Sequence, residues 1–248
     1  MIIDSHTHVD RVGWIDPPET IIGLMDEAEI EQAVIMTYGD APDVEGALEY
    51  IAEATVKYAG RLIGYARLNP WAGERALRLL EESMESYGFK GLKLHPAGNF
   101  SHPGSPETVE LIRLAATYAA PTLFHCGDEE FTLPLQVAAA AAACPQATII
   151  LGHCGGYFHV QDAIRVAEQH PNVILETSAM PYPQLIREAV ARIGAERVIY
   201  ASDGPGCPPA IEVHKVKLAR LTPDEEDAIF HGNIRRILGA VRTGEAKR

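Results

Sequence analysis

Short apolar stretches rich in β-branched residues recur along the chain roughly every 25–30 residues, the length of one strand–helix unit. We interpret these stretches as strands, because apolar, β-branched side chains fit a pleated and buried surface. The eight strand candidates are residues 2–5, 33–37, 62–66, 89–94, 122–125, 148–151, 173–176 and 198–201.

The segments between these strands have helical spacing and recognisable start signals. Pro17-Pro18 opens one helix, with Ile21 and Met25 on its apolar face. Ser105 is the expected N-cap of another helix, with Pro106 in its first turn. Uniformly apolar strands that alternate with helices predict a parallel sheet covered on both faces.

Eight strand–helix units favour a closed (β/α)8 TIM barrel, regular or distorted, over a doubly wound open sheet, the alternative α/β fold. The 248 residues fit one such domain, and no change in composition marks a second one. We therefore expect a single barrel over residues 1–248, with residues 241–248 as a frayed tail.

Composition supports a globular enzyme and excludes some partners. Hydrophobic residues make up 47% of the chain and charged residues 22%, which is ordinary for such proteins. A net charge of −13 argues against nucleic acid as a partner, because phosphate binding needs a clustered positive surface. A small anionic substrate stays compatible with that charge, since a metal ion and a few local cations can bind it.

The cysteines and the apolar segments indicate a cytoplasmic protein. The four cysteines form no CxxC pair and are expected to pack in a reduced interior. No basic stretch followed by an apolar run opens the sequence, and no apolar run reaches the roughly 18 residues that would predict a membrane span.

Metal-ligand side chains stand where four of the predicted strands end. The first strand runs into His6-Thr7-His8, and the fifth, sixth and eighth end at His125, His153 and Asp203. In a parallel barrel these ends share one rim, and residues two apart on a strand face the same way. Three of these imidazoles, in their neutral form, together with the carboxylate suit zinc or another first-row ion and leave a position for water.

These motifs resemble those of the amidohydrolase superfamily, and within it the amidohydrolase-related group of metal-dependent hydrolases and nonoxidative decarboxylases. The matching stretches, in order, are IIDSHTHVD, KGLKLHP, HCGD, LGHCGG, YASDGP and GNIRRILG, which together reach from Ile2 to Gly239.

The resemblance implies that His6, His8, His125 and Asp203 hold one divalent ion. It also implies that His153 orients the substrate and that Asp203 takes a proton from the water on the metal. That second role is physically reasonable, because a metal lowers the pKa of its water and a nearby carboxylate can accept the proton.

The third and fourth strands offer candidate substrate-binding residues, and they leave the number of metal ions open. Lys93 and His95 share one face of the fourth strand, and Arg67 closes the third strand, where a guanidinium can bind a carboxylate. In some members of the superfamily a carbamylated lysine at the Lys93 position bridges two metals. We favour one ion, most simply zinc. Glu176 ends the seventh strand, where it can support a ligand histidine.

Three functions remain open from the sequence. The leading one is a hydrolase that attacks a small amide, lactone or related carbonyl compound with metal-activated water. The second is a nonoxidative decarboxylase of a small unsaturated or aromatic acid. The third is a noncatalytic barrel that only binds metal or ligand, which the presence of His153 and Asp203 disfavours. Short βα loops suggest an open site for a small molecule, with a homodimer as a further option.

Overall fold

The computed structural model describes residues 1–10, 17–39 and 41–244, and strands alternate with helices along that part of the chain. The strands are β1 Ile3–His8, β2 Gln32–Met36, β3 Leu62–Gly64, β4 Ala66–Arg67, β5 Leu92–Leu94, β6 Thr122–Phe124, β7 Ile149–Leu151, β8 Val173–Glu176 and β9 Val198–Ile199. The α-helices are α1 Pro18–Glu27, α2 Val44–Lys57, α3 Glu74–Glu85, α4 Pro96–Asn99, α5 Pro106–Thr117, α6 Pro134–Ala143, α7 Val160–Gln169, α8 Pro183–Ile193, α9 Pro209–Leu218, α10 Pro223–Asp227 and α11 Asn233–Gly239. Short 3-10 turns cover Pro70–Ala72 (η1), Gly152–Gly155 (η2) and Ala195–Arg197 (η3), and Ala228–Gly232 (η4) is a π-helical turn.

All paired strands are parallel, and they fall into the orders β1-β2-β3 and β4-β5-β6-β7-β8-β9. The seam between these sheets lies within the predicted third strand, which is interrupted at Tyr65; the Tyr65 N–H still donates to the Ile35 carbonyl, 3.0 Å away. At the other seam Thr7 bridges Gly204, and the His8 N–H donates to the Gly204 carbonyl at 2.7 Å. The ring of strands is therefore closed, and the predicted barrel is confirmed over the open sheet.

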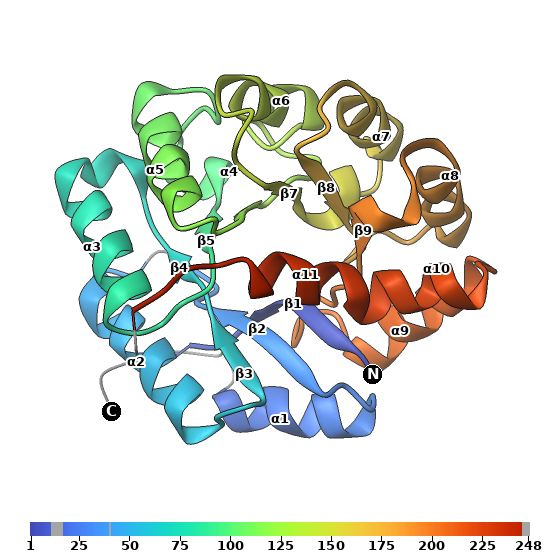
Figure 1. Ribbon diagram of the computed structural model, residues 1–248, viewed down its shortest axis with the longest axis horizontal. Coiled ribbons are helices and arrows are strands. Elements are labelled where there is room, and N and C mark those ends of the chain that lie inside the picture. The colour runs from blue at the N-terminus through green and yellow to red at the C-terminus, as the bar shows by residue number, and fades with distance from the viewer. Residues whose placement is uncertain (11–16, 40, 245–248) are drawn as a thin grey trace.

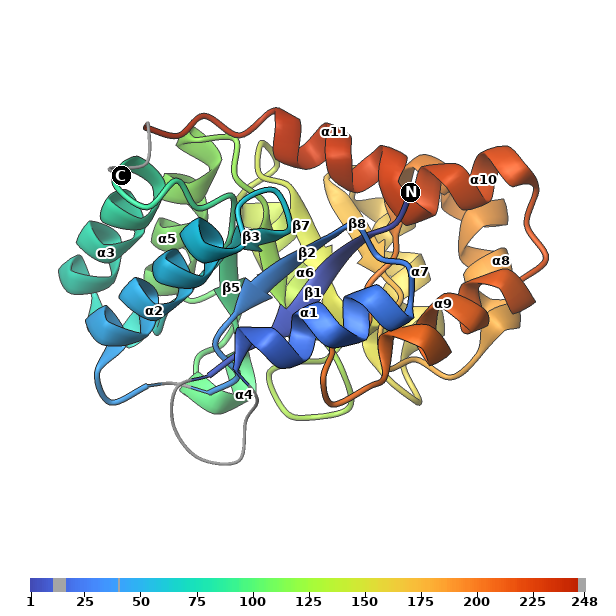
Figure 2. The same ribbon diagram turned by 90° about the horizontal axis from the view of Figure 1, so that it is seen from below.

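The interior of the barrel is filled at its lower end by inward-pointing side chains of the strands, and α11 closes that end. Ile234, Ile237 and Leu238 of α11 pack against this interior cluster. Figure 1 shows α11 lying across the ring of strands, and Figure 2 shows it on the opposite side of the molecule from α4. Since α4 follows the carboxyl end of β5, the side with α4 is the mouth of the barrel. The other residues of the interior cluster are Tyr65, between β3 and β4, and the strand residues Ile3, Val34, Met36, Leu123, Ile150, Ile174 and Ile199.

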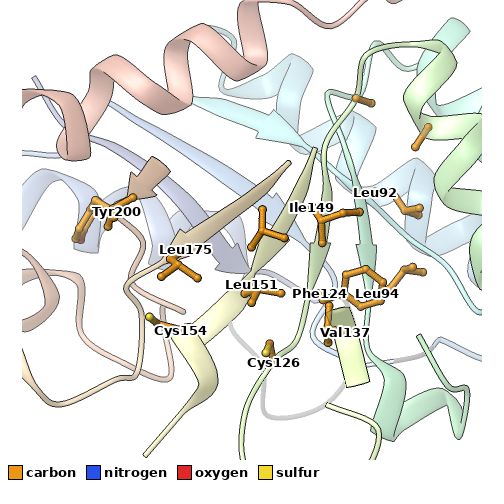
Figure 3. Close-up of a cluster of buried hydrophobic side chains, with 14 of the residues drawn as sticks. Leu92, Leu94, Phe124, Cys126, Val137, Ile149, Leu151, Cys154, Leu175 and Tyr200 are labelled. Carbon is orange, nitrogen blue, oxygen red and sulfur yellow. The ribbon is translucent and has the colours of Figure 1, made fainter. Parts of the chain in front are cut away.

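A second, larger apolar layer lies between the strands and the surrounding helices (Figure 3). It takes the alternate positions of each strand, such as Phe124 of β6 and Leu151 of β7, as side chains on a strand point to opposite faces. Cys126 and Cys154 belong to this layer, and burial raises the pKa of both thiols. Each thiol therefore packs away from the histidine that precedes it in the sequence.

Helix starts follow the predicted signals. Pro18 occupies the first turn of α1, and the Ser105 side chain accepts a hydrogen bond from the Thr108 N–H at the start of α5. No helix within residues 1–10, 17–39 and 41–244 combines the length and the apolar character that crossing a membrane requires.

The stretch predicted as a frayed tail begins with residues that contact the barrel. Val241 is buried, and the Arg242 guanidinium donates to the Thr117 carbonyl at 2.7 Å. Residues 245–248 lie outside the described part of the chain.

Candidate metal centre and active site

His6 and His8 reach the barrel mouth because β1 is irregular. The pairing of β1 with β2 shifts register between Asp4 and Thr7. An irregularity of this kind changes which side chains face inward, so Ile3 packs in the lower interior and His6 still enters the mouth. Both imidazoles are buried.

Two outer partners set the tautomers of these histidines. His6 Nδ1 donates to a Glu176 carboxylate oxygen at 3.0 Å, and His8 Nδ1 donates to the Thr37 carbonyl at 3.1 Å. Burial lowers the pKa of both imidazoles, so each is neutral and carries a lone pair on Nε2. The two Nε2 atoms lie 3.1 Å apart, and Asp203 Oδ1 lies 3.4 Å from one and 3.1 Å from the other. Three hydrogen-bond acceptors that converge in this way require a cation or an N–H or O–H group between them. Two imidazole nitrogens and a carboxylate oxygen in this arrangement are typical ligands of a metal ion.

Lys93 supplies one such donor. Its side chain is almost fully buried, and Nζ lies 2.8 Å from His6 Nε2. Burial, followed by the charge of Arg67, lowers the pKa of Lys93 to about 7, although Asp203 and Glu176 act in the opposite direction. An amine with such a pKa exchanges readily between its charged and neutral forms near neutral pH.

His125 stands apart from the three converging acceptors. Its Nδ1 lies 3.0 Å from His153 Nε2, and His153 Nδ1 lies 2.9 Å from Ser178 Oγ. Of the four predicted ligands, the structure brings His6, His8 and Asp203 together and places His125 in a neighbouring group. Three groups of described residues have their ligand atoms within 4.8 Å of one another: His6, His8 and Asp203; His6, His153 and Glu176; and His95, His125 and Glu129.

His95 and Arg67, two of the predicted substrate-binding residues, lie at the same mouth. The His95 ring stacks on His125 with 4.1 Å between the ring centroids, and its Nδ1 accepts a hydrogen bond from the Gly98 N–H at 3.0 Å. Burial and then the Arg67 charge lower the pKa of His95 to about 3, so the neutral ring carries its proton on Nε2. Arg67 itself is 7% exposed at the end of β4.

A cavity of about 320 Å³ opens beside these residues. Asp128 shapes one wall: its carboxylate accepts the N–H groups of Tyr157 and Phe158 at 2.9 and 3.0 Å. The sequence carried no signal for this link: Asp128 ends the HCGD stretch, but Tyr157 is 29 residues away and nothing in either segment indicates that the two are partners. The lining residues are His125, Gly127, Asp128, Glu129, His153, Gly156, Tyr157, Ala179 and Asp203.

Three residues other than glycine that line the cavity have left-handed backbone conformations, and Ala179, with a φ of +53°, is one of them. The φ of His153 is +61° and that of Asp203 is +63°. Such conformations are uncommon for residues other than glycine, asparagine and aspartate. For His153 this is a local strain at a candidate functional residue, of the kind that clusters at active sites.

Buried carboxylates brace the site from below. Glu176 also accepts the His153 N–H at 3.2 Å and the Ser178 N–H, so one side chain holds His6, His153 and the chain after β8. Asp4 accepts the N–H groups of His6 and Ser202 at 3.2 and 3.0 Å, and burial raises its pKa to about 7.

Comparisons with known proteins agree with this architecture. An uncharacterised TIM-barrel protein from Bordetella bronchiseptica has 19% sequence identity and a TM-score of 0.80, over 96% of this chain and 98% of that one. The 2,6-dihydroxybenzoate decarboxylase from Rhizobium has 16% identity and a TM-score of 0.74 over the same shares. A dihydroxybenzoic acid decarboxylase from Polaromonas sp. JS666, with bound manganese and the inhibitor 2-nitroresorcinol, has 17% identity and a TM-score of 0.76 over 96% of each chain.

At these identities the solved structures establish the fold alone. A search of curated protein sequences finds no significant match. The family follows from the sequence itself, because a family model described as amidohydrolase matches residues 3–240, nearly the whole chain. The chain therefore belongs to the amidohydrolase family.

Proposed function

We propose that the chain is a metal-dependent enzyme that removes carbon dioxide, without an oxidant, from a small aromatic or unsaturated carboxylic acid. The observation that carries this proposal is the pair of buried cations beside the converging acceptors: Lys93, 2.8 Å from His6 Nε2, and Arg67 at the end of β4. A substrate carboxylate is complementary to both side chains, because a guanidinium and an ammonium group each donate charge-assisted hydrogen bonds to carboxylate oxygens. The sequence analysis placed hydrolysis first and decarboxylation second, and this proposal reverses that order.

The metal would be held by His6, His8 and Asp203, with His125 reaching it from the neighbouring group. The donor set fits a first-row divalent ion, and zinc is the simplest choice for imidazole and carboxylate ligands. Manganese, the ion in the Polaromonas decarboxylase, is the alternative. A bound ion supplies Lewis-acid stabilisation of negative charge on a substrate oxygen. We propose one ion, with Lys93 acting as an amine rather than as a carbamate bridge.

The side chains divide the work of the reaction. Arg67 and Lys93 bind the substrate carboxylate and orient it, and their burial excludes water from that end. The carbon–carbon bond to the carboxylate breaks, its electron pair stays on the substrate carbon, and carbon dioxide leaves. A proton then adds to that carbon. His153 and Asp203 line the cavity and are the groups that can hold and deliver this proton, at His153 Nε2 or an Asp203 oxygen.

Hydrolysis of a small amide or lactone is the second candidate, and Asp203 favours it. Burial opposes ionisation of Asp203, but the surrounding imidazoles of His6, His8 and His153 outweigh it and hold the pKa of Asp203 well below the ordinary value. An ionised carboxylate in the cavity is the group that a hydrolase needs to take a proton from water.

The products decide between the two reactions. Metal-loaded protein is incubated in ¹⁸O-labelled water with a panel of hydroxybenzoates, short unsaturated acids, anilides and lactones, and gas and solution products are followed by mass spectrometry. We expect carbon dioxide release from an acid. A new carboxylate that carries ¹⁸O, with no carbon dioxide released, contradicts the proposal and establishes hydrolysis. Chelated protein and Asp203→Asn are the controls, and both should be inactive.

A further inference from the structure

A row of four side chains crosses one side of the mouth, from a cation to an anion. Arg67 ends β4, His95 follows β5, and His125 follows β6 and stacks on His95 at 4.1 Å. Glu129 completes the row, with its carboxylate 3.7 Å from His125 Nε2. The charge of Arg67 acts on His95, and both side chains approach Gly98, so the positive end of the row adjoins His95. Between the two charges stand two neutral, stacked rings.

The loop after β6 fixes the position of Glu129. The Glu129 N–H donates to Thr132 Oγ1 at 3.1 Å, and the Thr132 hydroxyl and N–H both donate to the Glu129 carbonyl, at 2.7 and 3.0 Å. Thr132 is fully buried, so it anchors this turn to the barrel. The Glu129 side chain remains 61% exposed and lines the cavity.

Three carboxylates line the cavity, those of Asp128, Glu129 and Asp203, and the Glu129 side chain is 61% exposed. The carboxylate of Asp128 accepts two backbone N–H groups, and Asp203 Oδ1 meets His6 and His8. Within the described chain, no lysine or arginine lines this cavity. A second carboxylate on a substrate would meet like charge there, whereas a hydroxyl or ammonium group would meet an acceptor.

The neighbouring histidines make a cation site at Glu129 unfavourable, although His95, His125 and Glu129 lie close enough for one. His95 Nδ1 is occupied by the Gly98 N–H, so Nε2 carries a proton and donates rather than coordinates. The two rings are stacked within 8° of parallel, so their in-plane lone pairs do not aim at one point between them.

We infer that Glu129 determines specificity: the site selects monocarboxylates that carry a hydroxyl, amino or ammonium group at the end away from the carboxylate, and it rejects dicarboxylates. This inference rests on the proposed function for the place of the substrate carboxylate, near Arg67. The far end of the substrate then lies over the stacked imidazoles and reaches Glu129.

Binding of matched ligands tests the inference without requiring turnover. The probes are 4-(aminomethyl)benzoate and benzene-1,4-dicarboxylate, with their 3-substituted isomers, titrated calorimetrically into metal-loaded protein. We expect the wild-type protein to bind the ammonium compound at least about tenfold more tightly, a typical effect of one charge pair at a half-exposed site. Glu129→Gln should bring the ratio near one, and Glu129→Lys should invert it.

Glu130→Lys is the matched control. Glu130 is exposed, follows Glu129 in the chain and does not line the cavity, and its substitution by lysine changes the net charge by the same amount as Glu129→Lys. It should leave the ratio unchanged, and 0.5 M salt should reduce the wild-type ratio. The inference is overturned if the wild-type protein shows no preference, if Glu130→Lys shifts the ratio as much as Glu129→Lys, or if Glu129→Gln binds less metal. If the wild-type protein releases no carbon dioxide from any acid but Glu129→Lys still inverts the ratio of the two affinities, the inference is supported and only the proposed reaction is contradicted.

Discussion

Lys93 Nζ lies 2.8 Å from His6 Nε2, and both side chains are buried. Because Glu176 fixes the proton of His6 on Nδ1, the Nε2 lone pair accepts from the Lys93 amine. A metal ion bound to His6 would use the same lone pair and has to displace this amine. The displaced side chain can then turn to a substrate carboxylate, which the ammonium form of Lys93 binds.

Glu176→Gln should weaken metal binding by about 10- to 100-fold, the usual effect of losing the partner that orients a ligand histidine. The carboxylate accepts hydrogen bonds from His6, His153 and Ser178, and an amide nitrogen cannot accept any of them. Competition with a chromophoric chelator measures the affinity. Glu188→Gln, a change at a partly exposed position on α8, should bind about one ion per chain as the wild-type protein does. If Glu176→Gln and Glu188→Gln bind the metal with equal affinity, Glu176 does not support the metal ligand His6.

Asp203→Asn should lower kcat by at least about 10²-fold, the scale expected when a proton-transfer group is lost. Asparagine tolerates the left-handed φ of +63°, so the backbone should keep its conformation. Thermal unfolding checks that point. The same reasoning covers His153→Asn, at a φ of +61°. If both variants turn over the true substrate at the wild-type rate, these two residues take no part in proton transfer.

Arg67→Met and Lys93→Met distinguish a cation that stabilises the reaction from one that only binds substrate. In a decarboxylase at least one of them should reduce kcat by about 10²-fold or more, because the cation acts on the charge that shifts as carbon dioxide leaves. If the cation only binds the carboxylate, equally in the ground state and in the transition state, its loss would instead raise KM and leave kcat unchanged. Lys217→Met, an exposed change on α9, is the control. Steady-state kinetics on the same acid gives both constants.

Metal-depleted protein should lose stability as the pH falls below about 6.5. Burial lowers the pKa of His6, His8, His95 and His125, and that of His95 reaches about 3. A base whose pKa is lower in the folded state stabilises fully above its unfolded pKa and loses that contribution as the pH falls toward the folded one. Each such group contributes up to about 1.4 kcal/mol per pH unit. Asp4, whose pKa is raised to about 7, acts in the opposite direction, but it is one group against four.

Urea unfolding between pH 7 and pH 4 measures this dependence. His95→Gln should make the slope shallower, whereas His214→Gln, at an exposed position on α9, should leave it unchanged. A free energy of unfolding that stays constant over this range would mean that the histidines are protonated in the folded protein.

The order of strands and helices, and the residues that end each strand, were accessible from the sequence. Apolar periodicity is a local property, and so is the rule that side chains two apart face the same way, which is why His6, His8, Asp203 and Lys93 could be assigned to the mouth. The third strand was predicted as one element, and its interruption at Tyr65 was not foreseen.

The partners of these residues were decided only by the tertiary structure. The sequence grouped His125 with His6, His8 and Asp203. In the structure the His125 ring contacts His153 and His95, and the His6 ring contacts Glu176 and Lys93. The placement of Glu129 beside His125 likewise depends on a turn anchored by Thr132. Strand ends on one rim can meet in several ways, and the choice depends on the stagger of the strands, on the irregularity in β1 and on hydrogen bonds between residues far apart in the chain. Each of these sets distances to a few tenths of an ångström, and local periodicity contains no information at that scale.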